Sequence, residues 1–357
     1  MNSIINSWNE WSQLNEIIVG NIDNACIPNP EPIYSIKTKN PFLQGKQYSD
    51  ESKVKANKQL NQFINVLKSE GVSVHRPTIN KENKAVVTPF FDSKFNYFTC
   101  PRDVYSVLGN TILEAPMSWR CRYFDHQQYI PLMNDFFFRD TNMKWVSCPK
   151  PIMSDNLYQN DYPIDINNRS YHAYNGSYGL TEVHPVFDAA DIYRCGKDLF
   201  VQIGFTTNKK GFEWIKRTFS DTFNVHPMRF ENNISPIHID AEMCIPKPNY
   251  LIYCPERPPT NESLQIFKDA NWTILKAPQP SNLPMMGCSS PWISMNILSI
   301  NEQLAIVEEN EKELIHLLNS IGIDTINVPF RDVYQFGGSF HCHTLDLNRD
   351  SGCESYL

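Results

Sequence analysis

The segment GGSFHCHTLDLNRD, residues 337–350, gathers several side chains that could do chemistry. Its cysteine, Cys342, has a histidine on either side, His341 and His343, and a pair of glycines stands shortly before it. A cysteine thiolate is a strong nucleophile where neighbouring groups support its ionisation. The chain has ten cysteines in 357 residues and no CxxC pair, so we expect reduced thiols, most of them small buried hydrophobes. Cys342 is therefore a candidate nucleophile only if other reactive side chains join it.

Polar residues stand beside apolar, strand-like residues in five parts of the chain. They are Asp103 in PRD, Asp188 and Asp191 in HPVFDAADIYRCGKD, His238 and Asp240 in PIHID, Ser289 and Ser290 in CSSPW, and Cys342 in FHCHT. Taken singly, each has an ordinary structural explanation, because an aspartate or serine at a strand end is usually a turn former or a cap. Together they offer one thiol, one imidazole and several carboxylates to a common site.

Such a set of groups favours one kind of chemistry. An imidazole can move a proton at neutral pH. Several carboxylates in one pocket repel each other unless a cation lies among them. A planar guanidinium suits this role because its N–H groups donate to carboxylates in fixed pairs. The residues therefore indicate attack of a thiolate on the central carbon of a guanidine.

A unit of two strands, a helix and a strand recurs five times and would position these residues. Its helices are predicted within residues 60–77, 127–149, 211–227, 261–278 and 311–329. Apolar residues follow helical spacing in these segments, and Gly71 and Gly322 stand where helix C-caps are expected. Gly-Asn, Gly-Lys and Asn-Glu pairs predict hairpin turns between the strands.

Five such units in a ring would bury one face of every sheet and leave a shared central channel, where the polar clusters would meet. We therefore expect an α/β propeller of five ββαβ blades with pseudo-fivefold symmetry, formed by residues 1–357 as a single domain. A doubly wound sheet is the competing fold.

The composition argues against several classes of protein. The chain is 41% hydrophobic and can bury a large core, and its net charge of −7 comes with no basic stripe for nucleic acid. No uninterrupted apolar run reaches the length of a membrane span, and the opening MNSIINSWNEW does not resemble a signal peptide. We expect a cytoplasmic enzyme.

Six motifs in order resemble the arginine:X amidinotransferases, the family that includes glycine amidinotransferase of creatine synthesis. They are NEWSQLNEIIVGNIDNACIP, PRDVYSVLGNTILEAPMSWRCRYF, FDAADIYRCGKDLF, HIDAEMCIPKPNYLIYCPERP, SSPWISMN and GGSFHCHTLD. The resemblance covers nearly the whole chain. It implies the five-bladed α/β propeller, or pentein, fold.

The resemblance also implies a mechanism and its residues. Cys342 is the expected nucleophile, His238 the general acid and base, and Asp188 the residue that orients both His238 and the guanidinium. L-arginine would transfer its amidino group to Cys342 and leave as L-ornithine, and a small acceptor amine would then take the group. The residues expected to bind substrate are Asp103, Asp240, Arg257, Ser289 and Ser290. No metal or organic cofactor is expected, and family members are often homodimers.

Two departures from the family pattern concern the acceptor and the nucleophile. Ser235 and Ile237, in NNISPIH, lie in the loop expected to select the acceptor, and they differ from the glycine-using enzyme. We therefore expect an acceptor larger than glycine, of the kind used in toxin biosynthesis such as that of saxitoxin, with glycine as the alternative. Ser339 replaces the usual third glycine before FHC.

Three other functions compete with amidino transfer. A guanidine hydrolase, such as a deiminase or dihydrolase, would use the same thiol with water in place of the amine. A metal module around Cys342 is disfavoured, because on a strand His341 and His343 would point one way and Cys342 the other. A binding protein on an inactive scaffold is disfavoured because every expected catalytic position is filled.

Overall fold

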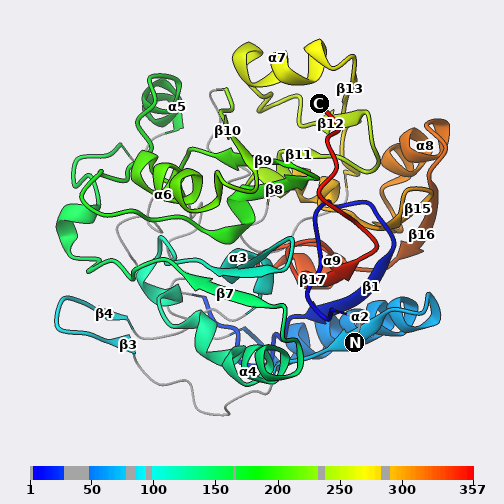
Figure 1. Cartoon of the computed structure of the whole chain (residues 1–357), viewed down its shortest axis with the longest axis horizontal. Coiled ribbons are helices and arrows are strands. Elements are labelled where there is room, and N and C mark those ends of the chain that lie inside the picture. Colours follow the sequence, from blue (N-terminus) through cyan, green and yellow to red (C-terminus); the bar gives the residue numbers. More distant parts are fainter. Residues whose placement is uncertain are drawn as a thin grey trace.

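The computed structural model describes residues 3–27, 48–77, 86–93, 99–163, 166–231, 238–282 and 290–357. Within these ranges the chain has an α/β fold in which five three-stranded sheets share one connectivity (Figure 1). In each sheet two strands pair antiparallel, and a helix then returns the chain so that a third strand pairs parallel with the second. The recurring unit predicted from the sequence is confirmed, and the alternative of one doubly wound sheet is wrong.

The five sheets and their helices have the following bounds. The first consists of β1 (Leu14–Val19), α2 (Asp50–Ser69), β2 (Ser73–His75) and the last strand, β17 (Thr344–Arg349). The second consists of β5 (Tyr105–Leu108), β6 (Thr111–Glu114), α4 (Ile130–Arg139) and β7 (Lys144–Ser147). The third consists of β8 (Ile192–Cys195), β9 (Asp198–Gln202), α6 (Lys209–Phe219) and β10 (Asn224–Met228). The fourth consists of β11 (Met243–Cys244), β12 (Tyr250–Tyr253), α7 (Asn261–Asp269) and β13 (Thr273–Lys276). The fifth consists of β14 (Leu298–Asn301), β15 (Leu304–Glu308), α8 (Lys312–Ser320) and β16 (Asp324–Val328).

The helices begin and end at residues suited to those positions. Gly71 and Gly322, which follow α2 and α8, have φ angles of +82° and +79°, a left-handed conformation that glycine adopts without steric cost. The side chains of Ser49, Asn208 and Thr260 accept backbone hydrogen bonds in the first turns of α2, α6 and α7. These caps satisfy N–H groups that have no partner within the helix.

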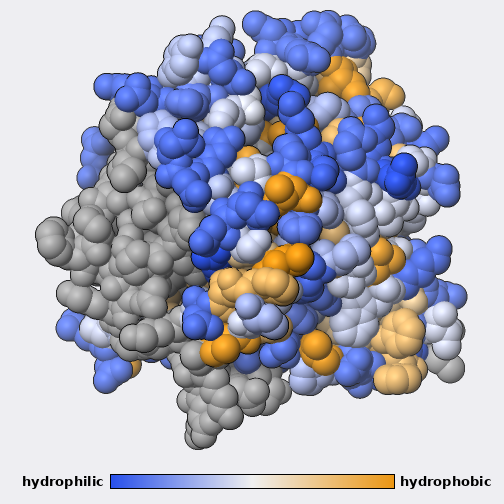
Figure 2. Space-filling view, turned by 90° about the vertical axis from the view of Figure 1, so that its left-hand side faces the viewer, coloured by the Kyte–Doolittle hydropathy of each residue, from blue (hydrophilic) through white to orange (hydrophobic). Residues whose placement is uncertain are grey.

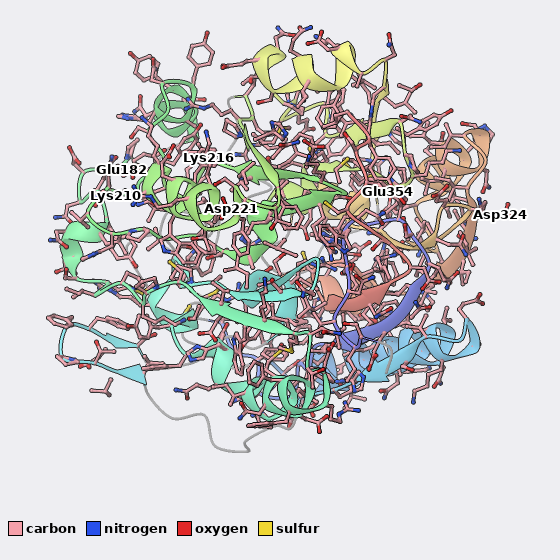
Figure 3. All side chains as sticks on the ribbon, in the orientation of Figure 1. Glu182, Lys210, Lys216, Asp221, Asp324 and Glu354 are labelled. Carbon is pink, nitrogen blue, oxygen red and sulfur yellow. The ribbon has the colours of Figure 1, made fainter. Side chains whose placement is uncertain are left out.

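A carboxylate also holds the start of α6. Glu182 accepts hydrogen bonds from the backbone nitrogens of Lys209, at 3.1 Å, and Lys210, at 2.9 Å, and Figure 3 shows Glu182 beside Lys210. A negative charge at this end of a helix also interacts favourably with the helix dipole. Glu182 lies in the segment that leads to Asp188, so the contact ties that segment to the third sheet.

The two terminal segments of the chain meet in the first sheet. β17 pairs antiparallel with β1, with Ile17 opposite Asp346, and the backbone nitrogen of Asn6 donates to the carbonyl of Leu347 at 2.9 Å. This pairing fixes the C-terminal GGSFHCH segment next to residues from the start of the chain. The turn that carries Cys342 also packs on α2, where the rings of Phe63 and Phe340 are 5.1 Å apart.

The described residues of each predicted polar motif lie in, or directly before, a short turn that leads into an edge strand of one of the five sheets. These turns are α3 (Pro101–Val104) before β5, η5 (Ala189–Asp191) before β8, η6 (Ile239–Ala241) before β11, η7 (Pro291–Met295) before β14, and residues 340–343 before β17. The turn α3 contacts η5, η5 contacts η6, and η6 contacts η7. Repetition of the same local structure therefore brings motifs that are far apart in the sequence to one place.

The remaining described elements lie outside the five sheets. They are a hairpin of β3 (Val86–Val87) and β4 (Asp92–Ser93), the helices α5 (Ile166–Tyr174) and α9 (Arg331–Tyr334), and the 3-10 helices η2 (Arg120–Arg122), η3 (Asp125–Gln128) and η4 (Asp155–Leu157). Figure 2 shows one face of the molecule, on which hydrophobic residues form small separate groups among hydrophilic ones. None of the helices in the described ranges combines the length and apolar character needed to cross a membrane.

Candidate active site

The predicted histidine, cysteine and three of the aspartates come together in a buried cluster. These residues are Asp103 in α3, Asp188 at the start of η5, His238 and Asp240 at η6, and Cys342 in the turn before β17. All five side chains are buried, so each charge must be matched by a neighbouring charge or hydrogen bond. The cluster draws on four separate sheets.

His238 lies between two carboxylates. Its Nε2 atom is 3.1 Å from Asp188 Oδ2, and its Nδ1 atom is 3.7 Å from Asp103 Oδ1. Burial disfavours the charged imidazole, but the charge of Asp103, the hydrogen bond to Asp188 and the charge of Asp191 outweigh it and raise the pKa of His238 to about 9. The imidazole is therefore protonated at neutral pH and can supply a proton.

Two residues that were not predicted from the sequence hold these carboxylates. Asp188 Oδ1 accepts hydrogen bonds from both the backbone nitrogen and the hydroxyl of Ser118, each at 3.0 Å. Asp103 Oδ2 pairs with Arg122 Nη1 at 2.5 Å, and Arg122 also donates to Asp125 through Nε at 2.8 Å. Both carboxylates are thus held in one orientation around His238.

Cys342 is fixed by its backbone as well as by its side chain. Its backbone nitrogen donates to Asn296 Oδ1 at 2.9 Å, and its Sγ atom donates to Asp240 Oδ2 at 3.4 Å. A Cβ atom at Gly338 would overlap Cys342 Cβ, which explains a glycine at that position. Burial and the negative charge of Asp240 raise the pKa of the Cys342 thiol well above its ordinary value. A cation bound beside the sulfur would oppose both effects and favour the thiolate.

Two carboxylate oxygens near Cys342 have no hydrogen-bond partner among the described residues. They are Asp103 Oδ1 and Asp240 Oδ1, and both are shielded from solvent. Buried carboxylate oxygens strongly favour N–H donors that carry positive charge. The expected role of Asp103 and Asp240, holding the nitrogens of a guanidinium, fits this arrangement.

Arg257 and Asp191 lie close to the cluster but have protein partners of their own. Arg257 forms an ion pair with Glu242, and burial lowers the pKa of its guanidinium to about 10. Asp191 Oδ2 accepts hydrogen bonds from Thr206 at 2.6 Å and Thr207 at 2.5 Å, and burial raises the pKa of Asp191 to about 7. The charge of Asp191 acts on both His238 and Arg257. The expected role of Arg257 in holding a substrate carboxylate stays a prediction.

The remaining predicted residues fall into two groups. Ser290 is described and caps η7, where its hydroxyl accepts a hydrogen bond from the backbone nitrogen of Trp292 at 3.3 Å. Ser235, Ile237 and Ser289 lie outside the described residues.

One local prediction about the nucleophile segment is wrong. Residues 341–343 form a turn and the strand begins only at Thr344, so the alternation expected of a strand does not apply to His341 and His343. His343 instead hydrogen-bonds through Nδ1 to the carbonyl of Ser339 at 3.1 Å. Within the described part of the chain, no group of three or more histidine, cysteine, aspartate or glutamate side chains could hold a metal ion.

The residues that support the cluster were not among those predicted from the sequence. They are Glu10, Ser118, Arg122, Asn296 and, as a partner of Asp240, His341. All five lie within the six motifs that carry the family resemblance. Their position within these motifs is therefore the sequence feature from which a role at the site could have been predicted. The pairings themselves depend on contacts between distant parts of the chain.

A separate cavity of about 530 Å³ lies beside α5, between Tyr174, Tyr178 and Arg229. None of the cluster residues lines it. The cavity lies near the site, because Tyr178 lines it and its phenol is close enough to Arg257 for their charges to interact.

Known proteins resemble this chain along nearly its whole length. It is 38% identical over 363 residues to the mitochondrial glycine amidinotransferase of Danio rerio, and the alignment covers 98% of this chain and 84% of that protein. It is 36% identical over 360 residues to the L-arginine:L-lysine amidinotransferase of Pseudomonas savastanoi pv. phaseolicola, covering 98% of this chain and 96% of that protein. No protein-family model matches the chain.

Solved structures agree with the sequence comparisons. SxtG, an amidinotransferase of the saxitoxin biosynthetic pathway from Microseira wollei, matches with a TM-score of 0.90 and 34% identity, over 99% of this chain and all of that one (100%). The inosamine-phosphate amidinotransferase StrB1 from Streptomyces griseus matches with a TM-score of 0.88 and 28% identity, over 99% of both chains.

Proposed function

The chain belongs to the amidinotransferase family and is a transferase, and from this premise we propose that it moves the amidino group of L-arginine to an acceptor amine larger than glycine. The observation that carries the proposal is the buried cluster of Cys342, His238 and three aspartates. Two of these aspartates present carboxylate oxygens without partners among the described residues. A thiol beside such oxygens suits attack on a guanidinium carbon.

The first half-reaction would transfer the amidino group to Cys342. The guanidinium of arginine would bind between Asp103 and Asp240, and its positive charge would favour loss of the Cys342 proton to solvent. The sulfur then attacks the guanidinium carbon. His238 gives its proton to the side-chain nitrogen of the departing ornithine as the carbon–nitrogen bond breaks. An amidino thioether on Cys342 and a neutral His238 remain, with Asp188 holding the imidazole.

The second half-reaction would reverse these roles. The acceptor amine attacks the amidino carbon, His238 takes a proton from the attacking nitrogen, and the sulfur leaves as the thiolate. The product carries a new guanidinium, and His238 is again protonated. One imidazole with a pKa of about 9 can serve in both directions, because the departing and the attacking groups are both amines.

The remaining parts of the proposal concern binding and assembly. Arg257 would turn from its ion pair with Glu242, or share it, to hold the substrate carboxylate, with Ser289 and Ser290 beside it. The five sheets would be blades arranged in a ring, as the repeated contacts of their first turns support. We expect a cytoplasmic homodimer.

The acceptor is proposed from the loop that precedes His238. Ser235 and Ile237 would select it, and their difference from the glycine-using pattern favours a larger amine. The match to SxtG, whose pathway makes saxitoxin, supports an acceptor from toxin biosynthesis. Glycine is the second candidate, because a glycine amidinotransferase is 38% identical to this chain. The lysine-using relative at 36% identity makes L-lysine a further amine to test.

Offering the enzyme labelled L-arginine with a panel of amines tests the function. The panel should include glycine, L-lysine and amino ketones, with mass spectrometry of the guanidinylated product. We expect ornithine to accumulate only with an acceptor, and an amine larger than glycine to give the higher kcat/KM. Faster turnover with glycine would support the second candidate. Abundant citrulline or urea from arginine alone would instead identify a guanidine hydrolase and overturn the proposal.

The pH dependence of the first half-reaction should reveal the proton donor. Because the pKa of His238 is raised to about 9, the imidazole carries its proton at neutral pH and loses it as the pH rises through about 9. Once the bound guanidinium of saturating arginine has ionised the Cys342 thiol, the single-turnover rate of ornithine release should therefore fall on the alkaline side with an apparent pKa near 9. Rapid-quench measurements between neutral and alkaline pH would test this. A rate that keeps rising to higher pH would contradict the assignment of His238 as the acid.

A further inference from the structure

His341, the residue before the proposed nucleophile, joins two carboxylates that belong to different parts of the structure. Its Nδ1 atom is 2.8 Å from Asp240 Oδ2, and its Nε2 atom is 3.1 Å from Glu10 Oε2. The residue is buried, and its ring lies nearly parallel to that of Tyr193, with centroids 6.0 Å apart. The proposed mechanism gives His341 no part, so its placement needs another explanation.

The hydrogen-bonding chemistry of the two partners defines what His341 must do. Burial would raise the pKa of Asp240, but the hydrogen bond and charge of His341 lower it below its ordinary value. Burial would likewise raise the pKa of Glu10, but the charges of Arg194 and Arg102 lower it. An ionised carboxylate only accepts hydrogen bonds, so the ring nitrogen bonded to Asp240 is the donor in that contact.

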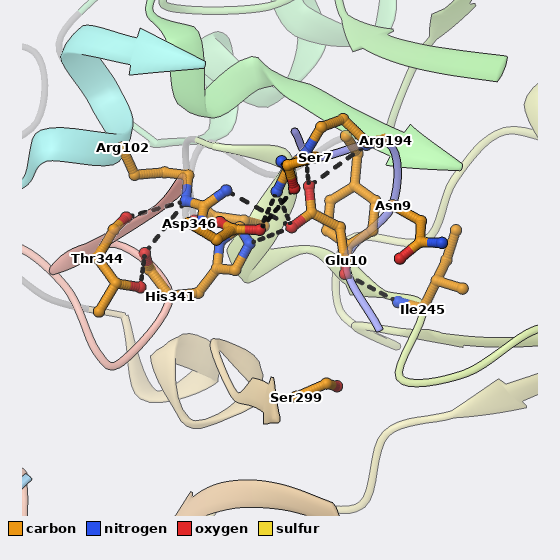
Figure 4. Close-up of polar contacts among 12 residues, drawn as sticks. Ser7, Asn9, Glu10, Arg102, Arg194, Ile245, Ser299, His341, Thr344 and Asp346 are labelled. Carbon is orange, nitrogen blue, oxygen red and sulfur yellow. Dashed lines mark hydrogen bonds and ion pairs between the residues drawn. The ribbon is translucent and has the colours of Figure 1, made fainter. Parts of the chain in front are cut away.

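Glu10 is a rigid partner for the imidazole. Arg194 donates to both of its oxygens, from Nε to Oε1 at 2.7 Å and from Nη2 to Oε2 at 2.5 Å. Arg194 also donates to Asp346 in β17 at 2.5 Å, and Arg102 bonds the same carboxylate (Figure 4). The imidazole is therefore braced on one side by a buried network that does not touch the sulfur.

The other side of the imidazole fixes the orientation of Asp240. Oδ2 of that carboxylate receives both His341 Nδ1 and Cys342 Sγ, while Oδ1 has no partner among the described residues. Rotation of the carboxylate would break the 2.8 Å bond, so His341 determines which oxygen stays available. Asn296 assists by donating from Nδ2 to the Asp240 backbone carbonyl at 3.1 Å.

We propose that His341, braced by Glu10, is a positioning residue that holds Asp240 with Oδ1 turned to the guanidinium of the substrate. The inference rests on the proposed function, since it assigns the donor as a guanidinium. The competing explanation is purely structural, in which His341 matters only as a member of the buried network around Glu10. The two explanations differ in which ring nitrogen is needed.

Replacement of His341 by asparagine or glutamine separates the two nitrogens. The side-chain nitrogen of asparagine can stand in for Nδ1 and keep the bond to Asp240, whereas that of glutamine can stand in for Nε2 and keep the bond to Glu10. We expect His341→Asn to retain kcat/KM for arginine within about 5-fold of wild type. We expect His341→Gln to lose about 10- to 100-fold, because a hydrogen bond to a charged group is lost at the substrate site.

The order of kcat/KM in the two variants decides between the positioning role and the structural role of His341. Equal losses, or a glutamine variant more active than the asparagine variant, would overturn the proposal in favour of the structural role. Should either variant fail to fold, Glu10→Gln offers a second test, since it removes the charge that braces His341 and keeps an oxygen for Nε2. It should lower kcat/KM about 10-fold, and unchanged kinetics would contradict the proposal. Ornithine formation by the wild-type enzyme tests the proposed function separately. If the wild-type enzyme forms no ornithine, the proposed function fails; if it does, the ranking of the variants tests only the role of His341.

Discussion

Cys342→Ser is expected to lower kcat/KM for amidino transfer by about 10⁴-fold or more, because it removes the atom that carries the amidino group. A hydroxyl at this site is much harder to ionise than a thiol. The same burial and the same Asp240 charge that raise the pKa of Cys342 would act on it. The exchange is nearly isosteric, and the backbone bond from residue 342 to Asn296 does not involve the side chain of residue 342. The fold should therefore be retained.

Steady-state assays of ornithine release, with thermal unfolding followed by circular dichroism, would test this expectation. Cys353→Ser is the matched control, because Cys353 is an exposed free cysteine near the end of the chain. It should leave both activity and melting temperature unchanged. Substantial transfer by Cys342→Ser would show that another group accepts the amidino carbon. The proposed function would then fail.

His238→Asn is expected to lower kcat by about 10³-fold, since general acid–base catalysis is lost in both half-reactions. Asparagine cannot give a proton to departing ornithine or take one from the acceptor. Asp188 and Asp103, which together with burial set the pKa of His238, would then lie on either side of a neutral amide. The first half-reaction should also lose its alkaline fall near pH 9.

A second histidine with a similar ion pair provides the control for this variant. His226 Nε2 lies 2.7 Å from Asp198 Oδ1, in the parallel pair of β9 and β10 and outside the cluster. His226→Asn should reduce activity no more than a few-fold. Equal losses in the two variants would indicate a general effect on the fold and contradict a catalytic role for His238.

The repeated architecture could be predicted from the sequence because its signals are local. Apolar residues at helical spacing and glycines at helix ends predicted all five helices that return to the sheets. Pro131 lies in the first turn of α4, where proline is tolerated because the backbone nitrogen there has no partner within the helix. These features depend on neighbours within a few residues, which a sequence displays directly.

The supporting contacts of the site could not be predicted in this way. Glu10 and His341 are 331 residues apart, and the pairing of β1 with β17 brings them together. Ser118 and Arg122 follow β6, and Ser118 reaches Asp188 across a sheet boundary while Arg122 turns back to Asp103. The types of these residues are ordinary, and their roles come from the three-dimensional arrangement.

The turn at Cys342 shows a different limit of predicting local structure from sequence. The alternating pattern of residues 341–346 is compatible with a strand, yet the chain stays in a turn until Thr344. The backbone nitrogen of His341 donates to the backbone carbonyl of Asn296, and that of Cys342 donates to the Asn296 side chain. These hydrogen bonds to Asn296, which lies just before β14 of the fifth sheet, therefore outweigh the local preference of residues 341–343 for a strand.

Mass spectrometry of the intact wild-type enzyme after brief exposure to L-arginine, without an acceptor, tests the central claim most directly. We predict that the protein gains the mass of one amidino group in place of a hydrogen. Peptide mapping should place that group on Cys342, and addition of an acceptor amine should remove it. An enzyme that forms product without ever carrying this group, or that carries it on another side chain, would contradict the account.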